Sequence, residues 1–170
     1  MCWISIDGTR VNYPVVQGED NLYYLKHLPD GTANAAGSIL MDAACDPLFG
    51  NDVTILHGHH MRSGAMFGSL DAYWEAAYAG AHPVIRLSTP DGDWDVDVFA
   101  ACTVNGATFG YPTTFADEQA FDRFVAQLKA ASAFDAGVSV AYGDRLLLLS
   151  TCAYSFADAR FVVAGRIRQP

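Results

Sequence analysis

Residues 146–167 read LLLLSTCAYSFADARFVVAGRI. Four leucines without a polar interruption are typical of a strand that is buried on both faces. The polar run AYSFADA, which follows Cys152, indicates a loop, and RFVVAGRI predicts a second strand that begins at Arg160. We therefore expect two strands joined by a loop, with a cysteine at the end of the first and an arginine at the start of the second.

Short apolar segments separated by turn residues fill most of the remaining chain. Residues 3–17 and 83–104 are predicted to form hairpins, and further strands are predicted to begin near residues 37 and 52. Strands dominate and do not alternate regularly with helices. This pattern favours a mainly β fold, an antiparallel or mixed barrel, over a doubly wound sheet.

One long helix is predicted near residues 114–132, beside this sheet. Thr114 is the expected N-cap, and a set of apolar residues follows the helical i, i+3, i+4, i+7 spacing. These apolar residues are Phe121, Phe124, Val125 and Leu128. The helix should therefore pack one face against the sheet.

Length and composition predict a single domain over residues 1–170. The chain is 51% apolar and 17% charged, which is enough apolar material for a sizeable core. It contains no apolar run of the roughly 20 residues that a membrane span needs, and no signal peptide. Since a strand-like segment starts almost at once, we expect any anchor or signal segment to lie upstream of this sequence.

The charge of the chain argues against a nucleic-acid partner. The net charge is −9, and the basic residues form no cluster with interleaved aromatic residues. The four cysteines show no CxxC pair and no zinc-ligand spacing. Cys102, in an apolar run, is expected to be a small core residue, and Cys45 an incidental loop residue.

Cys152 is the leading candidate for chemistry. A thiol at a strand-to-loop junction is held rigidly yet can be reached from solvent, which suits a nucleophile. The thiolate is the reactive form and needs a base or a cation beside it. On position alone, a buried and inert thiol remains the competing interpretation.

Histidine and arginine supply the groups that such a thiolate would need. His57, His59 and His60 follow a predicted strand in ILHGHHMRSG, and Arg160 opens the strand after the Cys152 loop. Alternate residues such as His57 and His59 share one face of a strand, so we weighed a zinc site. No carboxylate follows at a useful spacing, and we predict no metal site and an imidazole that pairs with Cys152. Arg160 is interpreted as a cation for the thiolate or an oxyanion, with a solvated arginine at a strand edge as the alternative.

Several stretches in order along the chain resemble the sortases, and specifically class B. AGSILMDAACDP is similar to the family's AGSIFMD, ILHGHHMRSGAMFGSL to its YGHNM…MFGSL block, and LLSTC to its TLxTC signature. DARFVVAGRI resembles the strand that carries the family's arginine. The resemblance covers nearly the whole chain, and the helix near residues 114–132 fits the helix that distinguishes class B from class A.

The resemblance implies a closed eight-stranded β-barrel with peripheral helices and a cysteine transpeptidase, a thiol peptidase of Gram-positive cell surfaces. Cys152, His59 and Arg160 match the family's catalytic residues. His60 stands where many members have asparagine, which leaves open which imidazole acts, and Leu148 replaces the first threonine of TLxTC. No cofactor is implied.

The implied partners are a peptide and an amine. Cys152 would cleave an NPxT-like sorting motif near the C-terminus of a secreted protein and form a thioester. An amine of a cell-wall precursor or of a pilin would then accept the acyl group. We expect a monomer that works at the extracellular face of the membrane, anchored through an N-terminal segment.

Three residues beside the nucleophile are candidates for peptide binding: Ser150, Thr151 and Tyr154. Two other functions remain open at this stage. One is a cysteine endopeptidase that does not transfer its acyl group to an amine, and the other is an inactive barrel that serves as a binding module.

Overall fold

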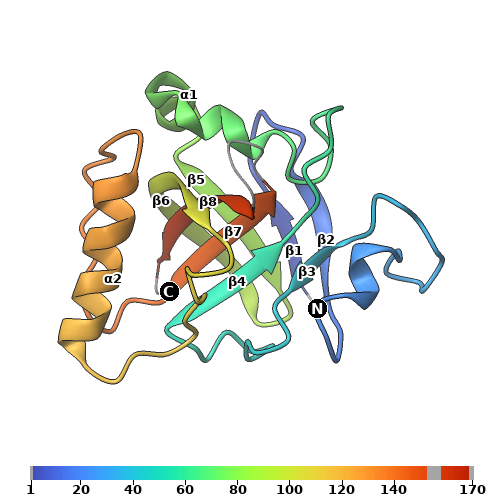
Figure 1. The fold of residues 1–170 in the computed structure, drawn as a ribbon, viewed down its shortest axis with the longest axis horizontal. Helices are drawn as coiled ribbons and strands as arrows, with labels where there is room; N and C mark the ends of the chain where they lie inside the picture. The colour runs from blue at the N-terminus through green and yellow to red at the C-terminus, as the bar shows by residue number, and fades with distance from the viewer. Residues whose placement is uncertain (1, 153–157, 169–170) are drawn as a thin grey trace.

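The described part of the chain forms a closed β-barrel with helices outside it (Figure 1). A computed structural model describes residues 2–152 and 158–168, without the side chain of Cys152. The strands are β1 (Cys2–Ser5), β2 (Asn12–Gln17), β3 (Ile39–Met41), β4 (Val53–His57), β5 (Val84–Thr89), β6 (Gly92–Asn105), β7 (Leu146–Cys152) and β8 (Ala159–Ile167). The predicted mainly β fold with an eight-stranded barrel is confirmed.

The order of strands around the barrel is β1-β2-β3-β4-β7-β8-β6-β5, and β5 returns to β1. The predicted hairpins are β1–β2 and β5–β6, both antiparallel. Two neighbours, β2–β3 and β4–β7, are parallel, and both need long connections. The barrel is therefore mixed, as the sequence pattern allows.

Strand β7 lies between β4 and β8 in the barrel wall. Each of its four leucines has a relative exposure of 0%, so both faces of this strand are covered. The side chains of β8 from Phe161 to Ala164 are also buried. The uninterrupted apolar runs in the sequence thus correspond to the most deeply buried strands.

Helix α2 (Glu118–Ala131) packs against β6 at one side of the barrel (Figure 1). Its buried residues are the four apolar ones that the spacing predicts: Phe121, Phe124, Val125 and Leu128. The predicted N-cap, Thr114, is wrong. Asp117 caps the helix, because its carboxylate accepts the amide N–H of Ala120 at 2.8 Å.

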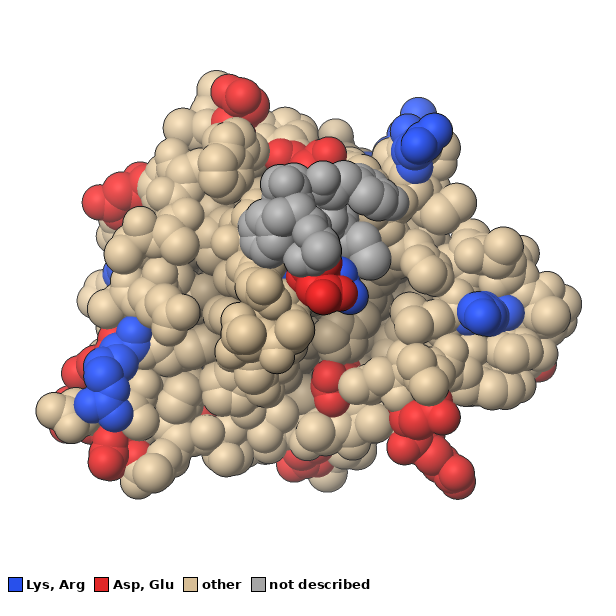
Figure 2. All heavy atoms as spheres, in the orientation of Figure 1, with Lys and Arg blue, Asp and Glu red and all other residues tan. Residues whose placement is uncertain are grey.

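Three short helical segments lie in the connections between strands. They are η1 (Tyr23–Leu25), between β2 and β3, and η2 (Leu70–Trp74) and α1 (Ala76–Ala81), between β4 and β5. Of the helices in the described residues, none has the length and apolarity to cross a membrane. On the face drawn in Figure 2, the basic side chains stand singly among neutral and acidic ones.

The cysteines Cys2, Cys45 and Cys102 are free and buried. Cys102 is a core residue, as predicted. Cys45 is not an incidental loop residue, because its sulfur accepts the amide N–H of Ile55 at 3.3 Å and lies 4% exposed in the core. Burial raises the pKa of Cys2 and of Cys102 to about 11, so both thiols are protonated at neutral pH.

Candidate active site

The ends of three neighbouring strands bring the candidate residues together. His57, the last residue of β4, pairs in register with Ser150 of β7, and the amide of Gly58 donates to the Ser150 carbonyl at 3.1 Å. Across the other edge of β7, Cys152 pairs with Arg160 of β8. The loop that carries His59 and the start of β8 therefore meet at the end of the strand that carries Cys152.

A pocket of about 330 Å³ opens at this point. Strands β7 and β8 contribute Ser150, Thr151 and Arg160, and the end of β4 contributes residues 57–59. The other walls come from the loops after β2 and β6 and from the end of β3: Asn21, Leu25, Asp42, Gly106 and Tyr111. Four of the six predicted site residues thus line one pocket: His59, Arg160, Ser150 and Thr151.

The other two predicted site residues can be placed only in part. The backbone of Cys152 follows Thr151 directly at the end of β7, but its side chain lies outside the described residues. Tyr154 also lies outside them. Its predicted role in peptide binding stays a prediction.

His59 is held in the pocket by the backbone of the β2–β3 connection. Its Nε2 lies 2.7 Å from the carbonyl oxygen of Leu25. A carbonyl can only accept, so Nε2 carries a proton and the ring orientation is fixed. The neighbouring His60 is directed elsewhere, with its Nε2 3.1 Å from Asp71 of η2, and it is not among the residues that line the pocket.

Arg160 is positioned by close packing against the connection that follows β6. A Cβ atom on Gly106 would lie 2.8 Å from Cγ of Arg160, so only glycine allows the arginine stem to pass this close. The Arg160 guanidinium donates to the carbonyl of Ala159 at 3.0 Å. Arg160 is among the residues that line the pocket.

Both predicted peptide-binding residues of β7 lie in the pocket wall, although both are almost fully buried. The Ser150 hydroxyl lies 2.7 Å from the Tyr111 hydroxyl. Tyr111 has a φ of 40°, in the left-handed region that non-glycine residues rarely adopt, and nothing in the local sequence signals it. This backbone turn places the tyrosine ring beside the end of β7.

The spacing of residues in the sequence does not predict the pairing of His57 with Asp42 in the pocket wall. Nε2 of His57 lies 2.8 Å from Oδ2 of Asp42, and the two side chains are 22% and 15% exposed. The hydrogen bond from His57 lowers the pKa of Asp42 to about 2, with smaller contributions from Ala44 and Asn21. The sequence carries one sign of this pair, because Asp42 directly follows the buried strand in SILMD. Residue spacing does not show that His57 is its partner.

This pair predicts an acid-dependent loss of stability. The pKa of Asp42 falls from its ordinary value of 3.8 to about 2 in the folded chain, so its ionised form stabilises the fold above pH 4. We expect roughly 2 kcal/mol of this stabilisation to disappear as the pH falls from about 4 to 2. Urea unfolding of the native chain and of Asp42→Asn across this range checks the prediction. The free energy of unfolding of the native chain should exceed that of the variant at pH 4, and this difference should disappear as the pH drops. An advantage that did not change with pH would contradict the assignment.

The histidine cluster does not form a metal site in the described structure. His57 and His59 bond to different partners, Asp42 and the Leu25 carbonyl. Within residues 2–152 and 158–168, no three side chains of His, Cys, Asp or Glu gather as metal ligands.

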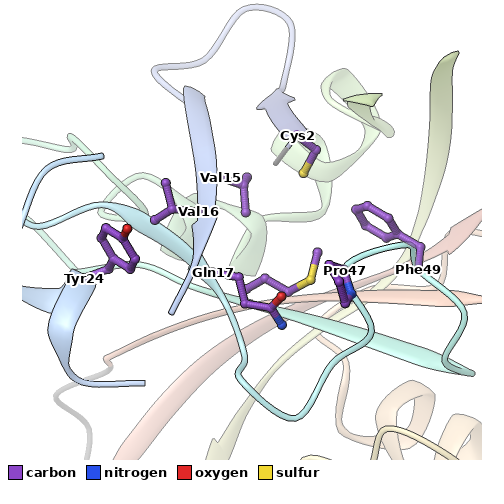
Figure 3. A pocket seen from close by; sticks show the side chains of 8 residues that line it. Cys2, Val15, Val16, Gln17, Tyr24, Pro47 and Phe49 are labelled. Atoms are coloured by element: carbon purple, nitrogen blue, oxygen red, sulfur yellow. The ribbon is translucent and has the colours of Figure 1, made fainter. Parts of the chain in front are cut away.

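A second hollow, of about 250 Å³, lies on another part of the barrel (Figure 3). Its wall is mainly apolar and includes Val15, Val16 and Phe49, with Cys2 at one side. The side-chain amide nitrogen of Gln17 donates to the backbone carbonyls of Asp42 and Cys45, at 3.0 and 2.7 Å. None of the predicted site residues whose side chains the structure describes lines this hollow.

Comparison with known proteins shows which family the chain belongs to. Residues 4–168 match the Sortase domain family. The chain belongs to the sortase family. Sortase B of Staphylococcus aureus is 34% identical over 97% of this chain and 68% of its own length.

Solved structures place the chain in class B. A Staphylococcus aureus sortase B–substrate complex superposes with a TM-score of 0.91 and 31% identity, and the match covers 99% of this chain and 79% of that one. A sortase B complexed with triglycine gives a TM-score of 0.92 and 33% identity, with the same coverage. The chain is thus a class B sortase in sequence and fold.

Proposed function

We propose that this sortase cleaves a sorting motif in secreted proteins, of the NPxT type, and transfers the acyl group to an amine. The observation that carries the proposal is that His59 and Arg160 line one pocket at the end of the strand that carries Cys152. The solved complex of a sortase B with its substrate supports a peptide as the partner. Such peptides are exposed outside the cell membrane, where we place the reaction.

In the first half of the proposed reaction, the Cys152 thiolate attacks the carbonyl carbon at the scissile bond. The carbonyl electron pair moves onto oxygen, and the Arg160 guanidinium stabilises that negative charge. When the tetrahedral intermediate collapses, the C–N bond breaks and the imidazolium of His59 gives its proton to the leaving amine. The products are a Cys152 thioester and the released C-terminal fragment.

In the second half, an acceptor amine attacks the thioester carbon. Neutral His59 takes the proton from the attacking nitrogen, and the Cys152 thiolate leaves, which regenerates the starting pair. A thioester is reactive enough toward amines for this exchange without a further activator. The sortase B structure with triglycine supports a short amine-bearing peptide as an acceptor model.

The experiment uses a fluorogenic NPxT peptide, with and without triglycine, and mass spectrometry of the products. A sortase that transfers its acyl group yields the ligated peptide and a faster release of fluorescence when triglycine is present. Cleavage to the free acid alone, at a rate that triglycine does not change, would identify a cysteine endopeptidase instead. Absence of cleavage and of Cys152 acylation would leave only a binding module.

A further inference from the structure

The carbonyl of Leu25 is an acceptor that η1 leaves without a backbone partner in the described part of the chain. The amide of Leu28, three residues on, donates to the Thr32 carbonyl at 2.8 Å instead. Pro29, four residues on, has no N–H and cannot continue a helix. Within residues 2–152 and 158–168, the partner of the Leu25 carbonyl is Nε2 of His59, at 2.7 Å. The last carbonyl of η1 is thus directed at the histidine of the pocket.

Gly37, in the same connection between β2 and β3, allows this carbonyl to take its place. Gly37 has a φ of 61°, in the left-handed region that favours glycine. A Cβ atom there would lie 2.5 Å from the carbonyl oxygen of Leu25 and 2.7 Å from that of Tyr24. The next residue, Ser38, ties the two segments together, because its amide donates to the Tyr24 carbonyl at 2.8 Å. An alanine at position 37 would therefore push the end of η1 away from its present position.

The backbone of His59 is fixed separately from its ring. The His59 carbonyl accepts the amide of Phe67 at 3.1 Å. The preceding Gly58 is closely packed, since a Cβ atom on it would lie 2.6 Å from the side chain of Ile39. A displaced Leu25 carbonyl would therefore leave the chain at His59 in place and release the ring. The orientation of the imidazole depends on the bond to Leu25.

We propose that Gly37 is a positioning residue that lets the Leu25 carbonyl hold the Nε2 proton of His59, so that Nδ1 exchanges protons with the substrate. The proposal rests on the proposed function, because it assigns the atoms of the same proton transfer. When the scissile C–N bond breaks, the proton on Nδ1 passes to the leaving amine. The ring then returns to the neutral form with its proton on Nε2, which the Leu25 carbonyl continues to hold. In the second half, the acceptor amine gives its proton to Nδ1.

The experiment measures single-turnover acylation of Cys152 by two sorting peptides, in the native chain and in Gly37→Ala. One peptide has the scissile amide. The other has a nitrophenyl ester at the same bond, and its phenolate leaves with the bonding electron pair and needs no proton. For the amide, Gly37→Ala should lower the maximal acylation rate on the order of 10²-fold, the cost of misplacing a reacting group by about 1 Å. For the ester, the fall should be at least about tenfold smaller, because no proton donor is needed.

Gly137→Ala is the matched control for backbone strain. Gly137 has a nearly equal φ of 66°, and a Cβ atom there would enter open space in the described structure. Alanine at either position is thus forced into a similar left-handed conformation, but only alanine at position 37 displaces Leu25. Gly137→Ala should keep the native acylation rates with both peptides. An equal loss in the two variants would make strain the cause and contradict the proposal.

Nitrogen NMR of the native chain tests the assignment of the ring atoms without a change at Gly37. The measurement uses isotope-labelled histidine at alkaline pH, where imidazoles are neutral and the ring signals show which nitrogen carries the proton. A His59→Gln variant identifies the signals of His59 among the five histidines. We expect the proton on Nε2 in the native chain and a mixture of both tautomers in Gly37→Ala. A native ring with its proton on Nδ1 would overturn the proposal, even if Gly37→Ala does not fold.

The outcomes separate this inference from the proposed function. If neither peptide acylates Cys152 in the native chain, the proposed function fails and the inference falls with it. If the native chain is acylated and Gly37→Ala keeps the native amide rate, Gly37 does not position His59 and the inference alone is wrong. The same holds if Gly37→Ala lowers the amide and ester rates equally, because the loss would then come from the shape of the pocket.

Discussion

A His59→Ala variant is expected to cleave the sorting peptide on the order of 10³-fold more slowly than the native chain, because the leaving amine loses its proton donor. The fall should appear in kcat, since the peptide pocket remains intact. A Cys152→Ala variant supplies the baseline without a nucleophile. Steady-state cleavage of the fluorogenic peptide measures the activity of the native chain, of His59→Ala and of Cys152→Ala.

His60→Ala is the matched control for this prediction. His60 is adjacent in sequence, but its ring is paired with Asp71 outside the pocket. The peptide-cleavage activity of His60→Ala should stay within about twofold of the native value, as for most substitutions away from reacting groups. If His60→Ala lost activity and His59→Ala kept it, the assignment of the base would have to be reversed.

An Arg160→Ala variant is expected to lose about 10²- to 10³-fold in kcat/KM, the usual cost of removing one donor to an oxyanion. Arg160→Lys keeps the charge but loses the planar fork of donors, so it should recover only part of the activity. The measurement is the rate of Cys152 acylation by the sorting peptide in single-turnover experiments.

Thermal unfolding supplies the control for Arg160. Its guanidinium bonds only to a neighbouring backbone carbonyl within the described structure, so the melting temperature of the alanine variant should stay near the native value. Native acylation rates in Arg160→Ala would show that the oxyanion is stabilised by other groups, such as backbone amides near Cys152.

The strands and their core could be predicted from the sequence because burial leaves a periodic or uninterrupted apolar pattern. The leucine run of β7 is the clearest case, since every one of its four leucines is buried. The predicted start of α2 was wrong by about one helical turn. Thr114 and Asp117 both suit an N-cap, and only the structure shows which side chain bonds the first turn.

The site could be predicted only where single residues carry the chemistry. The resemblance to the sortases picked out His59 among the three clustered histidines and Arg160 as the cation, and both line the pocket. The Asp42–His57 pair depends on β3 and β4 lying side by side, and Tyr111 depends on an unusual backbone angle. Neither property is encoded in local spacing.

The parallel pairing of β4 with β7 has a consequence for how the chain folds. These strands are distant in sequence, so their pairing closes a long loop. The entropy cost of closing that loop precedes the stabilising contacts between the strands. We therefore expect the candidate site residues at the ends of β4 and β7 to become neighbours only in a late step of folding. Recovery of peptide cleavage after dilution from denaturant should lag behind the formation of the β5–β6 hairpin, which is local.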